Sequence, residues 1–392
     1  MTALPTIHEA LALVLARAAP LSPEDVPVAR AAGRILAEPA AAATDLPPFD
    51  SSAMDGFAVR AADTPGRLSV VGQSAAGIPA QRELGAGEAI VISTGAVVPA
   101  GADAVVPVER TTGDVEVERV VPGDNVRPRG GDVRAGAVVI AAGSVLTPAQ
   151  VGALAAAGIA SVRCRRRPRV TLLATGSELR PPGQPLAPGE IYESNSVLLG
   201  AQLASAGAEV TVLDPVGDDA AATRDALERG LEADVLVTSG GVSVGPHDLV
   251  RAALAALGAE EVLWRVAVKP GKPIAFAVRD STLAFGLPGN PVSSLVDFEL
   301  FVRPALLALQ GAGDPGPVYL PGRLGSPLRR NEHRDELVRA RTLVARDAVV
   351  LEPLRGQESH MIVRSAEASA LVLVPHGLGV VPEGAFVRYL RI

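Results

Sequence analysis

Acidic residues follow glycine-containing turns at three places in the second half of the chain. Glu178 closes Thr175-Gly176-Ser177-Glu178, Asp218 follows Gly217, and Asp248 comes shortly after Gly240-Gly241-Val242-Ser243. Glycine lets backbone N–H groups approach an oxyanion, so such turns favour phosphate or a similar anion. Carboxylates would repel that anion unless a cation stood between them, and Mg²⁺ takes oxygen ligands and bridges phosphates. We therefore predict that Glu178, Asp218 and Asp248 hold Mg²⁺ or a similar divalent cation beside an anionic substrate.

Each of these features also has an interpretation that needs no ligand. Asp218 is suited to cap the N-terminus of a helix, and Asp248 to lie in a first turn, where a negative charge interacts favourably with the helix dipole. A single glycine turn is most often plain turn chemistry. The ligand-binding interpretation depends on several such turns meeting at one place.

The two lysines of the chain are a second chemical signal. Lys269 and Lys272 lie three residues apart in Lys269-Pro270-Gly271-Lys272-Pro273, whereas the other 34 of the 36 basic residues are arginines. A compact ammonium differs from a planar guanidinium in the ligands it suits, so a surviving lysine pair indicates an anion-binding site. The alternative is that two rare residues fell together by chance.

The elements needed to position these residues begin at Arg169. Apolar runs at 170–174, 210–213, 235–238, 262–268 and 283–287 alternate with helix-length segments at 195–206, 219–231, 248–257 and 292–309. This alternation predicts an α/β domain with a doubly wound, mostly parallel sheet. Ligands bind at the carboxyl ends of such strands. We expect five strand exits to converge there, with these ligand-binding candidates: Gly176, Ser239, Gly240, Gly241, Ser243, Lys269, Lys272, Pro288, Gly289, Asn290 and Pro291.

The rest of the chain predicts three further parts. Thr6 and Glu9 form a capping-box pattern before a short N-terminal helix, and the segment from Ser22 predicts the start of another helix. Short valine-rich runs between turns predict a β-rich insert, and Thr147 begins a second capped helix. We expect an N-terminal and linking region at 1–45 with 138–167, the insert at 46–137, the α/β domain at 168–312, and a small β domain at 317–392.

Composition excludes several classes of protein. A net charge of −7 and 3% aromatic residues argue against a nucleic-acid partner. The single Cys164 and five scattered histidines argue against a disulfide or a thiolate metal site. There is no long apolar run and no leader pattern, so we expect a cytoplasmic protein with no membrane partner.

Four motifs give the chain a family resemblance. Leu46-Pro47-Pro48-Phe49-Asp50-Ser51-Ser52-Ala53-Met54-Asp55-Gly56-Phe57-Ala58 is followed by Ser93-Thr94-Gly95-Ala96 and by Gly130-Gly131-Asp132-Val133. The strand-exit motifs end in Gly286-Leu287-Pro288-Gly289-Asn290-Pro291. From residue 6 to residue 392 the chain resembles the MoeA family, and its α/β part is similar to the molybdopterin-binding domain shared with MogA and gephyrin.

This resemblance implies a molybdenum insertase, which ligates molybdate into adenylylated molybdopterin (molybdopterin-AMP) and releases AMP with the help of Mg²⁺ or a similar ion. It implies a homodimer whose cleft combines two subunits, a barrel-like C-terminal domain, and partners such as a MogA-like adenylyltransferase and cofactor-accepting proteins. By resemblance, Pro288 and Pro291 line the site and Arg265 joins the lysines in holding the anion. The catalytic residues carried over are Asp55, Thr94, Asp132, Glu178, Asp218 and Asp248. The chain departs from the family pattern at Ser177, Pro246 and Ser369.

Two other functions compete with this interpretation. A molybdopterin carrier or scaffold would keep the fold and bind the ligand without turnover, although it would not need the full acidic set. The segment Gly241–Gly245 also fits the GxSxG pattern of a serine hydrolase using Ser243, with His333, His360 or His376 as a partner. The chain lacks the HGGG-type oxyanion motif that would support such a hydrolase.

Overall fold

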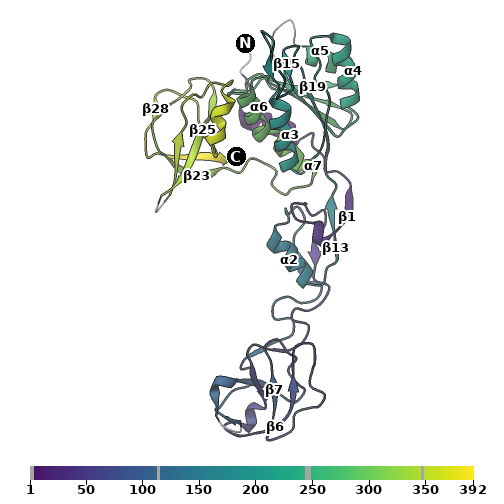
Figure 1. The fold of residues 1–392 in the computed structure, drawn as a ribbon, viewed down its shortest axis with the longest axis vertical. Coiled ribbons are helices and arrows are strands. Elements are labelled where there is room, and N and C mark those ends of the chain that lie inside the picture. Colours follow the sequence, from purple (N-terminus) through teal and green to yellow (C-terminus); the bar gives the residue numbers. More distant parts are fainter. Residues whose placement is uncertain (1–3, 113–114, 243–248, 346–347) are drawn as a thin grey trace. The chain divides into compact units, whose positions relative to one another are not determined.

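The computed structural model describes residues 4–112, 115–242, 249–345 and 348–392. The chain divides into two compact units, one formed by residues 1–24 and 164–392 and the other by residues 25–163 (Figure 1). No helix within the described ranges is long and apolar enough to cross a membrane.

A six-stranded sheet is the centre of the first unit. Its order is β17 (Glu209–Val212), β14 (Arg169–Ala174), β18 (Val235–Ser239), β22 (Thr282–Leu287), β21 (Ala275–Arg279) and β19 (Glu260–Trp264). The first four strands are parallel, β21 runs antiparallel to them, and β19, paired antiparallel with β21, again has the direction of the first four. The predicted doubly wound α/β class is confirmed.

The predicted strand at 262–268 is wrong in one respect, because it is two elements. β19 ends at Trp264, Arg265 takes a left-handed conformation with φ of +69°, and β20 (Val268–Lys269) pairs instead with a C-terminal strand. The strand β21, which follows the lysines, was not predicted. β19 nevertheless runs in the same direction as the four parallel strands, so the lysine segment follows a strand that ends at the same edge of the sheet, and the predicted strand exits do meet there.

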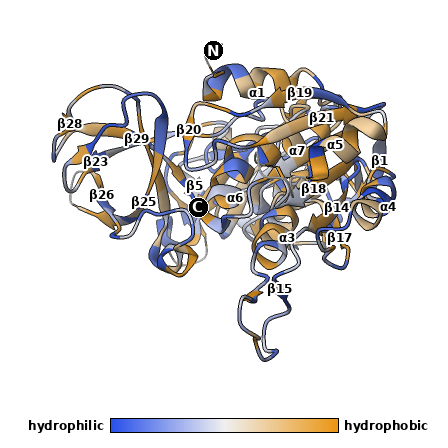
Figure 2. Ribbon diagram, turned by 90° about the horizontal axis from the view of Figure 1, so that it is seen from above, coloured by the Kyte–Doolittle hydropathy of each residue, from blue (hydrophilic) through white to orange (hydrophobic). Residues whose placement is uncertain are grey.

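Helices cover both faces of this sheet, because neighbouring residues of each strand point to opposite sides. Leu172 packs in one core with α3 (Asn195–Ser205), α6 (Pro291–Asp297) and α7 (Arg303–Leu309). Leu173 packs in another core with α4 (Ala220–Gly230) and α5 (Leu249–Ala256). The strands between them are mostly hydrophobic in Figure 2. Between α6 and α7 the chain forms a π-helical segment, η4 (Phe298–Val302).

The N-terminal helix is confirmed, and the helix predicted after it is wrong. α1 (Ile7–Leu15) begins at the Thr6 capping box and packs on the same core as α7. Residues Pro23–Pro27 form strand β1, paired with β13 (Ser161–Arg165), and only Val28–Arg30 makes a short 3₁₀ turn, η1. Pro27 disfavours the helical region for the residue before it, which keeps this segment extended.

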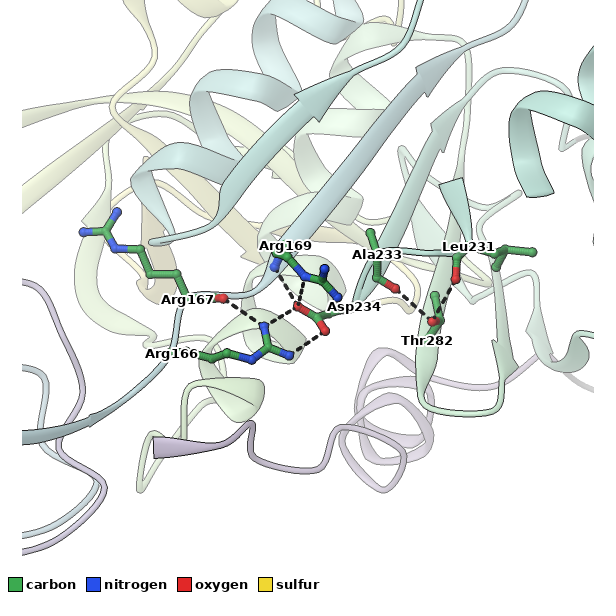
Figure 3. Close-up of polar contacts among 7 residues, drawn as sticks. All are labelled: Arg166, Arg167, Arg169, Leu231, Ala233, Asp234 and Thr282. Carbon is green, nitrogen blue, oxygen red and sulfur yellow. Dashed lines mark hydrogen bonds and ion pairs between the residues drawn. The ribbon is translucent and has the colours of Figure 1, made fainter. Parts of the chain in front are cut away.

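A single carboxylate ties together the amino ends of the central strands. Arg166 donates from both terminal nitrogens to the two oxygens of Asp234, at 2.6 and 2.7 Å (Figure 3). The Arg169 N–H, at the start of β14, donates to the same carboxylate at 2.8 Å. Burial alone would raise the pKa of Asp234, but these hydrogen bonds outweigh burial and lower it. Asp234 therefore fixes β14 beside β18 at the end of the sheet opposite the strand exits.

The C-terminal segment closes into a five-stranded barrel. The strands β25 (Asp335–Val344), β26 (Val349–Pro353), β23 (Leu320–Leu324), β29 (Phe386–Arg391) and β27 (Ala370–Val374) pair in that order, and β27 returns to β25. β24 (Leu328–Arg329), β28 (Val380–Val381) and the 3₁₀ helix η5 (Ile362–Glu367) lie between these strands in sequence. The expectation of a small β-barrel-like domain is confirmed.

The second unit is rich in short strands. Its largest sheet has the order β6 (Ser69–Ser74), β7 (Glu88–Ile92), β4 (Gly56–Val59) and β8 (Ala104–Pro107). Its helix α2 (Pro148–Ala156) starts at a capping box formed by Thr147 and Gln150, as predicted. The remaining short elements of the chain are β2 (Ala40–Ala41), β3 (Ser51–Ser52), η2 (Ala61–Asp63), β5 (Gly66–Arg67), η3 (Val108–Arg110), β9 (Thr111–Thr112), β10 (Glu116–Val117), β11 (Val126–Arg127), β12 (Val138–Ile140), β15 (Leu179–Arg180) and β16 (Ile191–Tyr192).

Arg339 on β25 is the largest fully buried side chain described. It donates to the carbonyl oxygens of Met361 at 2.6 Å and Gly356 at 2.5 Å, and to the Ser365 hydroxyl at 3.0 Å. These acceptors belong to the segment between β26 and β27, so one guanidinium organises that connection. A buried acceptor left without a donor costs about 1–3 kcal/mol.

We expect Arg339→Leu to lower the free energy of unfolding by about 3 kcal/mol, because three partly buried acceptors lose their charged donor together. Chemical denaturation monitored by circular dichroism measures this loss. Arg341→Leu, at an exposed position of the same strand, is the matched control and should change stability by less than about 0.5 kcal/mol. Equal effects of the two substitutions would contradict the role given to Arg339.

Candidate functional site

The strand exits of the first unit surround a cavity of about 410 Å³. Six of the predicted ligand-binding residues and two of the predicted acidic residues line it. The lining residues are Thr175, Gly176, Glu178, Asp218, Gly240, Gly241, Val242, Pro273, Pro288, Gly289 and Asn290. The cavity thus lies at the carboxyl ends of β14, β18 and β22, where an open parallel sheet binds its ligands. We call it the strand-exit cleft.

Glycine is required where two of these exits approach each other. Gly240 has φ of +93°, and a Cβ added there would lie 2.6 Å from the Thr175 carbonyl oxygen and 2.8 Å from its hydroxyl. Neither the backbone conformation nor the space admits a side chain. The Gly240 and Thr175 backbones therefore pack directly against each other where β18 and β14 end.

The two described carboxylates of the predicted metal site face this cleft. Asp218 is held by Ser177, whose hydroxyl donates to Asp218 Oδ2 at 3.1 Å and accepts from the Asp218 N–H at 3.0 Å. Over the described residues, no basic side chain pairs with Glu178 or Asp218, and no group of three potential metal ligands occurs. Two exposed, unpaired carboxylates are hard oxygen donors and fit a divalent cation. Asp248, the third predicted ligand, and Ser243 lie outside the described residues.

A buried amide that the sequence analysis did not single out supports the cleft from behind. Asn195, the first residue of α3, donates from Nδ2 to the Ser239 hydroxyl at 2.7 Å and to the Gly289 carbonyl at 2.8 Å. Ser239 and Asn195 are both buried. The amide therefore joins the exits of β18 and β22. Its only signal in the sequence is a polar residue at the start of a helix, which is too common to mark a site.

The predicted cationic residues lie on the connection from β19 to β21, beside the cleft. Pro273 of this connection lines the cleft, whereas Arg265, Lys269, Lys272 and Pro291 are not lining residues. Lys269 forms an ion pair with Glu336 of the barrel, with Nζ 3.0 Å from Oε1. Lys272 is exposed, and it has no ion-pair partner among the residues that the structure describes.

The three remaining candidates belong to the second unit. Asp55 and Thr94 lie together, because the Thr94 N–H donates to Asp55 Oδ1 at 2.8 Å. Asp132 lies in another loop, where its N–H donates to the Leu46 carbonyl at 2.9 Å. All three side chains are exposed. Within this unit the fold therefore brings Asp55 and Thr94 into contact.

A buried carboxyl group beneath the lysine connection was also missed. Asp297, the last residue of α6, is fully buried, and neither oxygen has a hydrogen-bond partner. A Cβ added to Gly271 would lie 2.1 Å from Asp297 Oδ1, so the loop between the two lysines rests against this group. Burial raises the pKa of Asp297 well above its ordinary value. Burial therefore favours the neutral form of this carboxyl beneath the loop between the two lysines.

Comparison with known families accounts for nearly the whole chain. Residues 5–158 match the MoeA N-terminal region (domains I and II), residues 171–308 match a probable molybdopterin-binding domain, and residues 321–392 match the MoeA C-terminal region (domain IV). The matched central range contains every described lining residue of the strand-exit cleft.

Individual relatives match over similar lengths. Molybdopterin molybdenumtransferase 2 of Mycobacterium tuberculosis is 38% identical over 391 residues, covering 92% of this chain and 93% of the relative. The molybdopterin molybdenumtransferase of Haemophilus influenzae is 41% identical over 300 residues, covering 74% of each chain. A solved MoeA protein from Pyrococcus horikoshii superimposes with a TM-score of 0.83 at 32% identity, covering 100% of this chain and 99% of that one.

Asp297 makes stability depend on pH. With a raised folded-state pKa, the group's contribution is fully present below its pKa in the unfolded chain, and it is lost as pH rises through the folded-state pKa. We expect Asp297→Asn to remove this loss, so that the variant's advantage in free energy of unfolding grows with pH above about 4. Denaturant titrations from pH 4 to pH 9 measure it. Asp225→Asn, exposed on α4, is the control, and parallel pH profiles for Asp297→Asn and the parent would contradict this account.

Proposed function

This chain belongs to the MoeA family, and from that premise we propose that it is a molybdopterin molybdenumtransferase, which inserts molybdate into molybdopterin-AMP and releases AMP. The observation that carries the proposal is the strand-exit cleft, where two carboxylates with no ion-pair partner among the described residues face glycine-containing turns within the range matched by the molybdopterin-binding domain. Relatives with that enzyme name, aligned along almost the whole chain, support it.

The chemistry asks the protein mainly to hold charged groups in place. An oxygen is added to the adenylyl phosphorus as its bond to the molybdopterin phosphate oxygen breaks, which gives AMP and molybdopterin phosphate. The two dithiolene sulfurs of the substrate replace oxygens of molybdate, which leave as water with the thiol protons. The sulfur ligands belong to the substrate, so a chain with one cysteine is adequate. Catalysis then consists of positioning and electrostatic stabilisation around the phosphorus.

Glu178 and Asp218, with Asp248 as the expected third member, would hold Mg²⁺ or a similar divalent ion. When bound, such an ion neutralises charge on a phosphate. The Ser177 hydroxyl bonds to both the carboxylate and the backbone N–H of Asp218, so the family departure at position 177 supplies an orienting hydroxyl rather than another carboxylate. Gly240 and Gly241, both with positive φ, form a turn whose backbone lines the cleft where the phosphate would bind.

Arg265, Lys269 and Lys272 would supply the positive charge for the anionic substrate. Their arrangement assigns them different tasks. Lys272 is exposed and outside any described ion pair, so it is available to bind molybdate or the pterin phosphate. Lys269 shares its charge with Glu336 and anchors the connection to the barrel. Replacing Lys269 therefore disturbs position as well as charge.

We also propose a homodimer in which Asp55, Thr94 and Asp132 of one subunit complete the strand-exit cleft of the other. The contact between Thr94 and Asp55 presents an exposed carboxylate, which is suited to a ligand rather than to a core. The proposed division at 1–45 with 138–167, 46–137, 168–312 and 317–392 assigns these three residues to the insert and Glu178 to the α/β domain. Partners delivering or accepting the pterin, and a cytoplasmic location, belong to the same proposal.

We expect molybdate-dependent AMP release from molybdopterin-AMP in the presence of Mg²⁺, and at least about a hundredfold loss of it in Asp55→Ala, because a group acting at the reacting centre contributes on that order. Lys269→Ala should also lose activity. Chromatographic quantitation of AMP with and without molybdate measures both. Arg224→Ala, exposed on α4, is the control.

The other functions give different results in the same assay. Tight binding of molybdopterin-AMP without AMP release would indicate a carrier. Hydrolysis of activated esters that is lost in Ser243→Ala would indicate a serine hydrolase. Absence of any binding would refute the proposed function.

The composite cleft makes a second prediction. Asp55→Ala and Glu178→Ala should each be inactive alone, yet a mixture refolded or co-expressed together should regain activity. Random pairing gives heterodimers in which one of two clefts is intact, so about a quarter of the parent activity per subunit is expected. Mixing Glu178→Ala with Asp218→Ala is the matched control. Both residues belong to the α/β domain, so each of the two clefts of a mixed dimer still carries a substitution. If neither mixture regains activity, the proposal of a cleft shared between subunits is refuted.

A further inference from the structure

The single tryptophan of the chain is stacked between two arginines. The guanidinium carbon of Arg251, on α5, lies 3.7 Å from the centroid of the Trp264 ring, and that of Arg265 lies 3.8 Å from it. A cation over each face of an indole is favourable, by about 0.5–2 kcal/mol for each contact. Both faces are occupied by the protein itself, so the indole is not a platform for a base or a pterin. We call Arg251, Trp264 and Arg265 the arginine–tryptophan stack.

The Arg251 side chain of the stack is held in place by the protein itself. Arg251 donates from Nε to Glu261 Oε2 at 2.7 Å and from Nη2 to Glu261 Oε1 at 2.9 Å. This bidentate pair holds the plane of the guanidinium. Glu261 lies on β19, three residues before the tryptophan. The Arg251 guanidinium therefore packs against the Trp264 indole in a fixed orientation and restricts rotation of the indole.

Arg265 differs from Arg251, because within the described residues it is held by the face of its guanidinium and not by its edges. Its backbone is left-handed, with φ of +69°, which costs an ordinary residue on the order of 1 kcal/mol. Its N–H is bonded to the Ile274 carbonyl at 2.9 Å. Throughout the described part of the chain, no acceptor is hydrogen-bonded to its guanidinium. A guanidinium fixed by stacking, with its in-plane donors unpaired, is arranged to receive an oxyanion.

The stack also touches two walls of the strand-exit cleft. The Trp264 indole N–H donates to the Val242 carbonyl at 3.4 Å, and buried Val242 lines the cleft. The backbone partner of Arg265, Ile274, directly follows Pro273, another lining residue. Displacement of the ring would therefore disturb both Arg265 and the exits beside it.

We infer that Arg251 and Trp264 are positioning residues, which hold the Arg265 guanidinium beside the strand-exit cleft so that it can bind an oxyanion of the substrate, phosphate or molybdate. This inference rests on the proposed function and deepens it. Arginine is required at position 265, because a lysine ammonium has no planar face to stack on the ring. Neither Arg251 nor Trp264 touches the substrate, so both act through Arg265.

The test combines steady-state AMP release from molybdopterin-AMP with titrations of the intrinsic tryptophan fluorescence, which in this chain reports Trp264 alone. Arg251→Ala should raise KM for molybdopterin-AMP about tenfold while kcat changes by less than about threefold, equivalent to roughly 1.4 kcal/mol of binding. Arg265→Ala should raise KM further, and Arg265→Lys should resemble Arg265→Ala. Arg224→Ala is again the control and should match the parent.

A double-substitution cycle separates positioning from general destabilisation. Arg251→Ala should have no further effect on KM in a chain that already carries Arg265→Ala, because it acts through that residue. Additive effects, or an Arg251→Ala variant equal to Arg224→Ala, would overturn the inference. Thermal unfolding identifies any variant that fails to fold, and Trp264→Phe, which keeps a ring for stacking, should then retain more affinity than Trp264→Leu.

The inference and the proposed function can fail separately. If the parent protein releases no AMP, the proposed function is refuted, and the stack is judged by fluorescence titration with molybdate and with AMP as separate probes. A fluorescence-detected affinity for either probe that weakens in both Arg265→Ala and Arg265→Lys supports the inference. An affinity that is the same in the parent and in both variants, or no response to either probe, overturns it.

Discussion

The parallel pairing of β17, β14, β18 and β22 is the constraint on which the rest of the first unit depends. In a parallel sheet every strand ends at the same edge, so the turns after Ala174, Ser239 and Leu287 must meet. Asp234 clamps the opposite ends of two of these strands to Arg166 and Arg169. The register fixed there determines which residues face one another at the cleft.

Patterns with local causes could be predicted from the sequence. The apolar runs of β14, β18 and β22 and the capping boxes at Thr6 and Thr147 identified the correct elements, because the signals lie within a few residues of one another. The errors arose where a single backbone torsion or a proline decided the outcome. Arg265 interrupts an apolar run through a positive φ. Pro27 keeps extended the segment after Ser22, which resembles the start of a helix.

The candidate site was only partly accessible to the same approach. Glycine turns with acidic neighbours led to Gly176, Glu178, Asp218 and Gly240, which do line one cleft. The groups that support the cleft could not be found this way. Asn195 bonds to Gly289 across 94 positions, and the indole of Trp264 meets an arginine from another element. Such pairs leave no periodic mark in a sequence, since their chemistry depends on contacts that only the folded chain makes.

The closed barrel is attached to the lysine connection through one added strand. β20 adds to β25 as a sixth strand, with Val268 opposite Asp335 and Lys269 opposite Glu336. Backbone pairing and an ion pair therefore join the barrel to the lysine connection. The C-terminal domain therefore sets the path of the lysine connection, although no described residue of the barrel lines the strand-exit cleft.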